Sequence, residues 1–280
     1  MAVEVPPLPR RLPLRGGRLL GRWGGAAWEY APALVLLAAL VGLWELMVEV
    51  LDTRPYILPA PSAIWDAFID KGHLLPNHIQ ATATEAVLGL LAAAGGGVLL
   101  AVLIASIPLA RRVLYPIIVT SQTVPAIVLA PLLMVWVGIG LESKLIVVAL
   151  VGFFPIVVST VDGLASADRD MVALVRSMGA SRLEELRHVL IPSAIPGFFA
   201  GLKIAAAYSV IGAVIAEWVA AKEGLGIFII RSQASFRIDQ IFVAIAVIAL
   251  LSIALFVAVH LLARVASPWK YANDQGENGS

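Results

Sequence analysis

Histidine is the residue in this sequence best suited to acid–base catalysis or metal binding, and it occurs at His73, His78, His188 and His260. A hydrolytic site would need a nucleophile and a base, or several metal ligands, close together. No pair of these histidines has ligand spacing with a carboxylate, and the absence of cysteine excludes thiolate sites and disulfides. We therefore expect no catalytic residue and no metal site.

Nucleotide and nucleic-acid binding are excluded on similar grounds. A phosphate-binding loop would need the pattern Gly-x-x-x-x-Gly-Lys-Ser/Thr, and no Gly-Lys pair occurs in the sequence. The formal net charge of +1 does not fit a strongly basic nucleic-acid binder. We expect a chain that is not an enzyme and that holds no cofactor.

The charged residues gather in one loop, at about residues 165–193. Asp168 and Asp170 favour a helix start, because a helix N-terminus attracts negative charge. An apolar stripe follows at a spacing of three residues: Val172, Val175 and Met178. Gly179 permits the positive φ that ends many helices. The spacing predicts a first short amphipathic helix that ends at Gly179.

A second short helix is predicted directly after the first. Ser181 and Glu184 have the S-x-x-E spacing of a capping box. Its apolar positions are Leu183, Leu186 and Leu190, and Pro192 is expected to stop it. Helices this short are unstable alone, so their apolar stripes need either the protein's own bundle or a groove on a partner. Both alternatives remain open at this point.

The elements that must carry this loop are membrane spans. Of the 280 residues 60% are hydrophobic and 14% charged, against about 25% charged in soluble domains. Six apolar segments are long enough to cross ~30 Å of hydrocarbon. They cover about residues 31–50, 86–107, 113–137, 145–164, 195–221 and 241–263. The chain is predicted to be an all-α, polytopic integral membrane protein with residues 28–268 as its membrane domain.

Basic residues predict the orientation. They concentrate at residues 10–22, 111–112, 169–187 and 264–270, which share one side if the segments alternate. The positive-inside rule then places both termini and the 165–193 loop in the cytoplasm. Residues 1–27 are expected to form a basic cytoplasmic tail, with the first apolar run retained rather than cleaved, and residues 269–280 a disordered tail. Residues 63–69 predict a short helix, either interfacial or packed as an ordinary loop helix.

A transport path is expected near the prolines of the spans, because a proline frees carbonyl groups that must line a cavity or find partners. The candidate lining residues are Gln122, Thr123, Pro125, Phe153, Phe154, Tyr208 and Ser209. Helix packing is the alternative role for these residues. Gly197 and Gly201, and the run Gly95-Gly96-Gly97, are interpreted as sites of close helix contact.

An ion-coupled secondary transporter that works without an ATPase is the alternative function. It would use acids embedded in the membrane. Glu45, Glu49 and Glu217 fall near the outer ends of segments, and Lys203 near an inner end, where snorkelling or contact with solvent is expected. Span centres without charge weaken this alternative.

The loop and its flanks resemble a known family. The run Arg176-Ser177-Met178-Gly179-Ala180-Ser181, followed by Ile191-Pro192, resembles the cytoplasmic EAA loop of ABC-importer permeases. The flanking runs are similar too: Gln122–Pro125, Ala130–Leu133, Gly138–Gly140, Gly152–Pro155, Ser193–Pro196, Gly201–Ala205 and Ala216–Trp218. The pattern covers about residues 60–268 and looks like the nitrate/sulfonate/taurine branch. One departure is Ala173-Leu174-Val175, where the family has Glu-Ala-Ala, so a substitute would have to be Glu184 or Glu185.

The resemblance implies a type I ABC importer permease fold in the plasma (inner) membrane of a prokaryote. It implies that the loop docks on an ATPase through residues 176–181, Leu183, Glu184, Leu186 and Pro192. It further implies an ATPase dimer that holds ATP and Mg²⁺, an extracytoplasmic substrate-binding protein and a second copy of this chain. The runs Val214–Trp218 and Phe236–Phe242 look more like the relatives for pyrimidine thiamine precursors and riboflavin than those for sulfonates, taurine, nitrate or bicarbonate.

Overall fold

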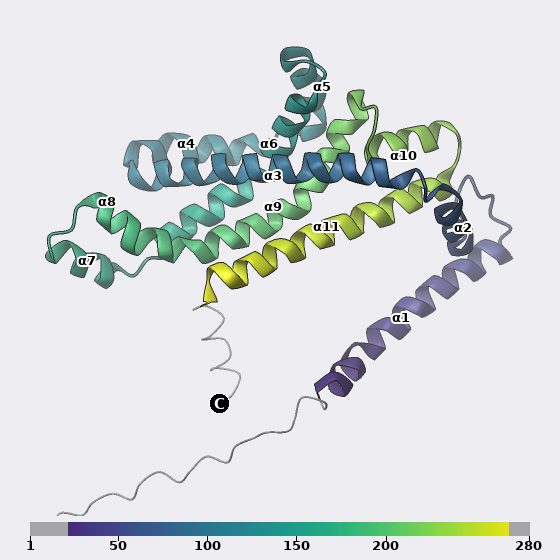
Figure 1. Cartoon of the computed structure of the whole chain (residues 1–280), viewed down its shortest axis with the longest axis horizontal. Helices are drawn as coiled ribbons and strands as arrows, with labels where there is room; N and C mark the ends of the chain where they lie inside the picture. Colours follow the sequence, from purple (N-terminus) through teal and green to yellow (C-terminus); the bar gives the residue numbers. More distant parts are fainter. Residues whose placement is uncertain (1–21, 269–280) are drawn as a thin grey trace, which may run out of the picture.

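A computed structural model describes residues 22–268, and the side chains of residues 22–30 and 220 are outside this description. Most of the predicted 1–27 tail and the whole of the predicted 269–280 tail therefore lie outside the described residues. The described part is helical (Figure 1). Its helices are α1 (Arg22–Val50), α2 (Pro61–Lys71), α3 (Leu75–Ser106), α4 (Pro108–Ser121), α5 (Ala126–Val137), α6 (Leu141–Ala165), α7 (Arg169–Ser177), α8 (Arg182–Glu185), a π-helix (Leu186–Leu190), α9 (Ile191–Ala220), α10 (Leu225–Ala234) and α11 (Ile238–Ala266).

The expected set of spans is confirmed as five long apolar helices and one bent pair within residues 22–268. The long ones are Ala31–Val50, α3, α6, Arg182–Val219 and α11. The third expected span is not continuous, because α4 and α5 meet at an angle of 103°. Pro125 causes this break: its ring supplies no N–H to the preceding turn, and it stands in extended geometry before α5. The second span begins at Leu75 rather than Ala86.

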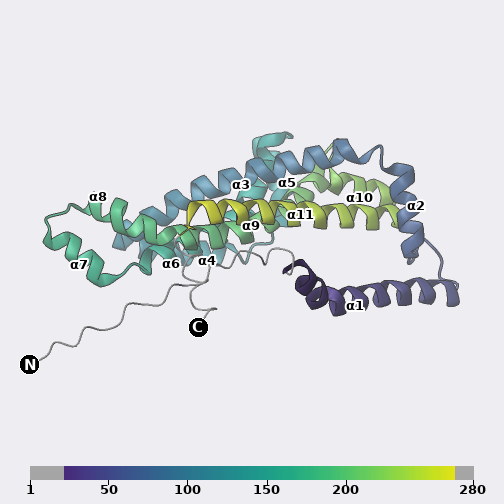
Figure 2. The ribbon, with the colours of Figure 1, turned by 60° about the horizontal axis from the view of Figure 1, so that its bottom comes forward.

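The bundle has two distinct ends (Figures 1 and 2). We name the end that carries α7 and α8 the loop end, and the end that carries α2 and α10 the far end. The helix α1 runs toward the far end, and α11 runs from the far end back toward the loop end. The first and last spans therefore both have their chain-terminal ends on the side of the loop.

The centre of the bundle is built on glycine contacts between α6 and α9. A Cβ atom on Gly197 would lie 2.5 Å from the carbonyl oxygen of Ser159 and 3.0 Å from the Cα of Gly163. A Cβ on Gly201 would collide with the carbonyl oxygen of Pro155. The predicted close contact at Gly197 and Gly201 is confirmed, since backbones approach this closely only where side chains are missing.

The glycine run on α3 is used differently from the prediction. A Cβ on Gly97 would lie 2.9 Å from Ile156, so this residue does permit close packing. Gly95 and Gly96 face open space, with nothing within 4 Å of an added Cβ. They lie on the outer face of α3, because successive helix positions turn by about 100° and cannot all face one partner.

The first helix contacts the rest of the chain near the far end. Trp44 lies 5.4 Å from Phe242, ring to ring. The Glu45 carboxylate accepts hydrogen bonds from the Ser62 hydroxyl and backbone N–H, at 2.6 and 3.0 Å, and so anchors the start of α2. The predicted helix at residues 63–69 is α2, and it packs through the buried Ala67.

Candidate functional site

The first helix of the loop, α7, starts and ends as its sequence predicts. The Asp168 carboxylate accepts a hydrogen bond from the backbone N–H of Asp170 at 2.8 Å and caps the helix. At the other end Gly179 has φ +87°. The N–H of Gly179 donates to the carbonyl of Arg176 and that of Ala180 to the carbonyl of Val175, which is a Schellman ending. The tip of the loop is therefore a defined turn.

The second helix begins with the predicted capping box. The Ser181 side chain accepts from the N–H of Glu184, and the Glu184 carboxylate accepts from the N–H of Ser181 at 2.8 Å. Two backbone donors of the helix start are thereby satisfied.

Pro192 does not stop this helix, contrary to the prediction. The chain continues through the π-helix Leu186–Leu190 into α9. In this wider turn the N–H of Ile191 donates to the carbonyl of Leu186, five residues back. The extra residue makes room for the proline ring, which would clash with a carbonyl four residues back in a regular α-helix. One continuous rod thus links the loop tip at Arg182 to the far end at Ala220.

An ion pair joins the two loop helices. Arg176 of α7 donates two hydrogen bonds, of 2.8 and 2.9 Å, to the carboxylate of Glu185 on α8. The carboxylate raises the pKa of Arg176 above its ordinary value, so this side chain stays charged. Glu184 is engaged in the capping box and Glu185 in this pair. Both carboxylates considered as substitutes for the one absent at Ala173 therefore have partners within the loop.

Some apolar side chains of the loop are packed against the protein, and others are exposed. Val172, Val175, Leu186 and Leu190 are half-buried against the protein itself. Met178 and Leu183 are 79% and 72% exposed and stand on either side of the Gly179 turn. Apolar side chains gathered on an exposed tip are typical of a surface that binds a partner.

The break between α4 and α5 contains a cavity of about 340 Å³. Three of the predicted path residues line it together, namely Gln122, Pro125 and Phe153. Its other walls come from Leu150 and Val151 of α6 and from neighbours of the break. The bend therefore creates a partly polar hollow at the place where the prolines predict a path.

The other candidate path residues lie outside the lining of this cavity. Thr123 is exposed and its hydroxyl donates to the carbonyl of Thr120. Phe154 packs against the apolar cluster around Ile104. Tyr208 is half-exposed on α9, whereas Ser209 is fully buried and donates to the carbonyl of Ala206.

Glu217 corrects a sequence-based expectation. The residue was expected to snorkel or to contact solvent, but it is 0% exposed. Its carboxylate accepts hydrogen bonds from the Thr82 hydroxyl at 2.6 Å and the Gly226 N–H at 2.5 Å. Thr82 in turn accepts from the N–H of Leu225, and His78 Nδ1 from that of Gly224.

This network holds the start of α10 against α3 and α9. The first N–H groups of a helix have no acceptor within the helix, so a buried helix start requires acceptors from elsewhere. Sequence reasoning missed the roles of His78 and Thr82. The sequence pattern that could have indicated this contact is Glu217 followed by Gly224-Leu225-Gly226, a glycine-rich turn that leads into a helix.

Comparisons with known proteins agree on one family. Residues 97–270 match the family described as binding-protein-dependent transport system inner membrane component. The chain is 37% identical to the formylaminopyrimidine transport permease protein ThiX of Halalkalibacterium halodurans, over 85% of this chain and 95% of that one. It is 35% identical to the riboflavin transport system permease protein RibX of Chloroflexus aurantiacus, over 87% and 91%.

A solved structure supports the fold. A chain of the inward-facing MetNI methionine ABC transporter superposes with a TM-score of 0.57 at 21% identity, covering 70% of this chain and 98% of that chain. The expected ABC importer permease fold is thereby confirmed. The protein is a multi-pass permease of the inner membrane. On these grounds the chain belongs to the family of binding-protein-dependent transport system inner membrane components.

Proposed function

We propose that this chain forms the translocation path for a small solute, with a pyrimidine precursor of thiamine or a riboflavin-like compound favoured over sulfonates, taurine, nitrate and bicarbonate. An extracytoplasmic binding protein delivers the solute. The preference rests on the formylaminopyrimidine and riboflavin relatives at 37% and 35% identity, above the 30% identity to the taurine permease TauC of Escherichia coli.

The loop end is the proposed docking surface for a dimer of ATPase subunits, which hold ATP and Mg²⁺ and perform the hydrolysis. The supporting observation is the exposed apolar tip, with Met178 and Leu183 beside the ordered turn at Gly179. Both termini and this tip are proposed to be cytoplasmic, because the start of α1 and the end of α11 lie on the side of the loop and basic residues flank all three in the sequence.

The continuous helical rod Arg182–Ala220 couples ATP hydrolysis to movement of the membrane spans. A displacement of α8 by the ATPases is passed along α9, because helical hydrogen bonding continues from Arg182 to Ala220. The glycine contacts between α9 and α6 oblige α6 to move with it. A second copy of the chain is proposed to complete the path, and the cavity at Gln122, Pro125 and Phe153 is proposed to be part of its lining.

The test is Gly179→Asp in the permease–ATPase complex in proteoliposomes, with uptake and ATP hydrolysis measured together. The variant is expected to lower the number of solutes taken up per ATP, because aspartate adds bulk and charge to the docking tip. Gly179→Ala is a matched control, because it places a Cβ at the same positive φ and in the same open space but adds no charge.

Two results would contradict the proposal. The first is an unchanged ratio of uptake to hydrolysis in Gly179→Asp. The second is uptake by the purified chain alone under a proton or sodium gradient, which would support the secondary transporter instead.

A further inference from the structure

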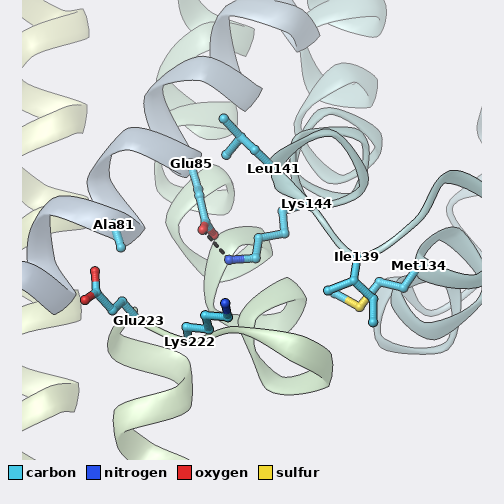
Figure 3. Close-up of a pocket in the computed structure, with 9 residues that line it drawn as sticks. Ala81, Glu85, Met134, Ile139, Leu141, Lys144, Lys222 and Glu223 are labelled. Carbon is cyan, nitrogen blue, oxygen red and sulfur yellow. Dashed lines mark hydrogen bonds and ion pairs between the residues drawn. The ribbon is translucent and has the colours of Figure 1, made fainter.

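A charged cavity of about 410 Å³ opens at the far end of the bundle (Figure 3). Its walls come from α3, the end of α5, the segment before α6, the first turn of α6 and the connection between α9 and α10. The lining includes Ala81, Glu85, Lys144, Lys222 and Glu223. Ligand pockets span about 300–1,000 Å³, so this cavity has room for a solute with a single ring.

The inner wall of the cavity is an incompletely satisfied ion pair. The Lys144 ammonium donates to Glu85 Oε1 at 2.6 Å, and the two side chains are only 13% and 5% exposed. The second carboxylate oxygen, Glu85 Oε2, is buried without a hydrogen-bond donor from the described residues. An ammonium has three N–H groups, and Glu85 accepts one of them. Among residues 22–268, N–H groups of Lys144 without an acceptor therefore stand beside a Glu85 oxygen without a donor.

The mouth of the cavity carries a second pair of opposite charges, Lys222 and Glu223. Lys222 and Glu223 are exposed, and the Lys222 side chain extends toward the ion pair (Figure 3). The two lysines and two glutamates that line the cavity sum to zero formal charge. An anion would face two carboxylates and a cation two ammonium groups, so the site favours a solute without net charge.

We propose that this cavity is a binding station for a neutral, planar solute whose ring edge carries an N–H donor next to a nitrogen or oxygen acceptor, such as an aminopyrimidine. Glu85 Oε2 is buried behind the cavity wall, so binding requires a rotation of this carboxylate that presents Oε2 to the N–H of the solute, while the neighbouring acceptor takes an N–H from Lys144. This inference rests on the proposed function for the direction of transport. The far end would be the extracytoplasmic end, so the solute meets this station on entry.

The first test uses the absence of cysteine, which makes Ala81→Cys the only thiol in the chain. The permease–ATPase complex in nanodiscs, without binding protein, is treated with a small thiol reagent in the presence of formylaminopyrimidine. Labelling is expected to slow by about tenfold at about ten times the Kd, because protection follows 1 + [L]/Kd. Ala63→Cys is the matched control, since Ala63 is also half-buried at the far end but lies outside the cavity lining.

The second test removes the negative charge of the acceptor and replaces one of its two oxygens by an NH2 donor. Adding Glu85→Gln to Ala81→Cys is expected to raise the Kd by about tenfold or more, as for loss of a hydrogen bond to a charged group. Glu142→Gln makes the same charge change in the first turn of α6 outside the cavity lining and is expected to keep protection. Glu85→Gln combined with Lys144→Met restores a cavity without net charge. This variant is expected to assemble with the ATPase, whereas the pyrimidine is expected not to protect Ala81→Cys from labelling.

Three outcomes would overturn the inference. They are labelling of the parent Ala81→Cys complex that the pyrimidine does not slow, equal slowing when Glu85→Gln is added to Ala81→Cys, and slowing by taurine but not by the pyrimidine. If uptake persists in any of these cases, the proposed function survives while the station is lost. Protection of Ala81→Cys in a complex that takes up no solute would support the station and contradict the proposed function.

Discussion

Gly201 offers a sharp test of how α6 and α9 are held together. In Gly201→Ala the new methyl group would collide with the carbonyl oxygen of Pro155 and lie 2.9 Å from the Cα of Ile156. Both are backbone atoms, which cannot rotate away as a side chain can. The two helices must therefore separate for the variant to fold.

The expected loss in the free energy of unfolding of Gly201→Ala follows from the size of the overlap between the new methyl group and the α6 backbone. Carbon atoms in contact prefer about 3.5–4.0 Å, so relief requires a shift of roughly 0.5–1 Å, which forfeits a quarter to a half of the neighbouring contact energy. Overpacking of this kind typically costs about 1–3 kcal/mol. Alanine gains up to about 1 kcal/mol over glycine from helix propensity. Gly96→Ala has the same gain without the collision, because nothing lies within 4 Å of its added Cβ.

The free energy of unfolding is measured for both variants by titrating the purified chain in mixed micelles with SDS and following tryptophan fluorescence. Gly201→Ala is expected to be less stable than Gly96→Ala by about 1–3 kcal/mol, since the propensity gain cancels in the comparison. A middle value of about 2 kcal/mol changes the ratio of folded to unfolded protein by about 30-fold. Equal stability of the two variants would refute the close α6–α9 contact.

The remaining predictions concern the two ends of the bundle. Glu217→Ala leaves the buried N–H of Gly226 without its acceptor, at about 1–3 kcal/mol, whereas the Thr82 hydroxyl keeps the His78 carbonyl at 3.1 Å, so hydrogen exchange at the start of α10 is expected to accelerate. Unchanged exchange there would contradict the network, and Glu217→Gln, which keeps an acceptor oxygen, is the control. Ser181→Ala removes one half of the capping box with Glu184 and is expected to cost about 1 kcal/mol. Faster proteolysis of the loop would reveal this loss, Ser181→Asp should reverse it, and equal rates for all three chains would count against the cap.

The sequence predicts the loop well because its signals are local. The Asp168 cap, the positive φ of Gly179 and the Ser181–Glu184 box each involve residues no more than three positions apart. Such signals depend on backbone geometry within one turn and need no knowledge of the rest of the fold. Pro192 shows the limit of this reasoning, since a π-turn upstream accommodates the ring that was expected to end the helix.

The charged residues of the far end could not be interpreted in the same way. Glu85 and Lys144 are 59 positions apart, and Thr82 and Glu217 are 135 positions apart. Their positions along separate spans do not reveal that they meet. The snorkelling expected for Glu217 is the correct default for an acid near the end of an isolated helix. It is overridden because α10 folds back and buries the carboxylate under its own backbone donors.

The sequence by itself determined that this protein spans a membrane with helices, where the loop at residues 165–193 turns and which family it resembles, because apolar length, caps and motifs are properties of contiguous residues. Tertiary structure alone decided that α4 and α5 diverge around a cavity, that α8 and α9 form one rod and that opposite charges at the far end face one another. The physical reason is that these features depend on which helix faces meet, and that is set by packing among segments far apart in the chain.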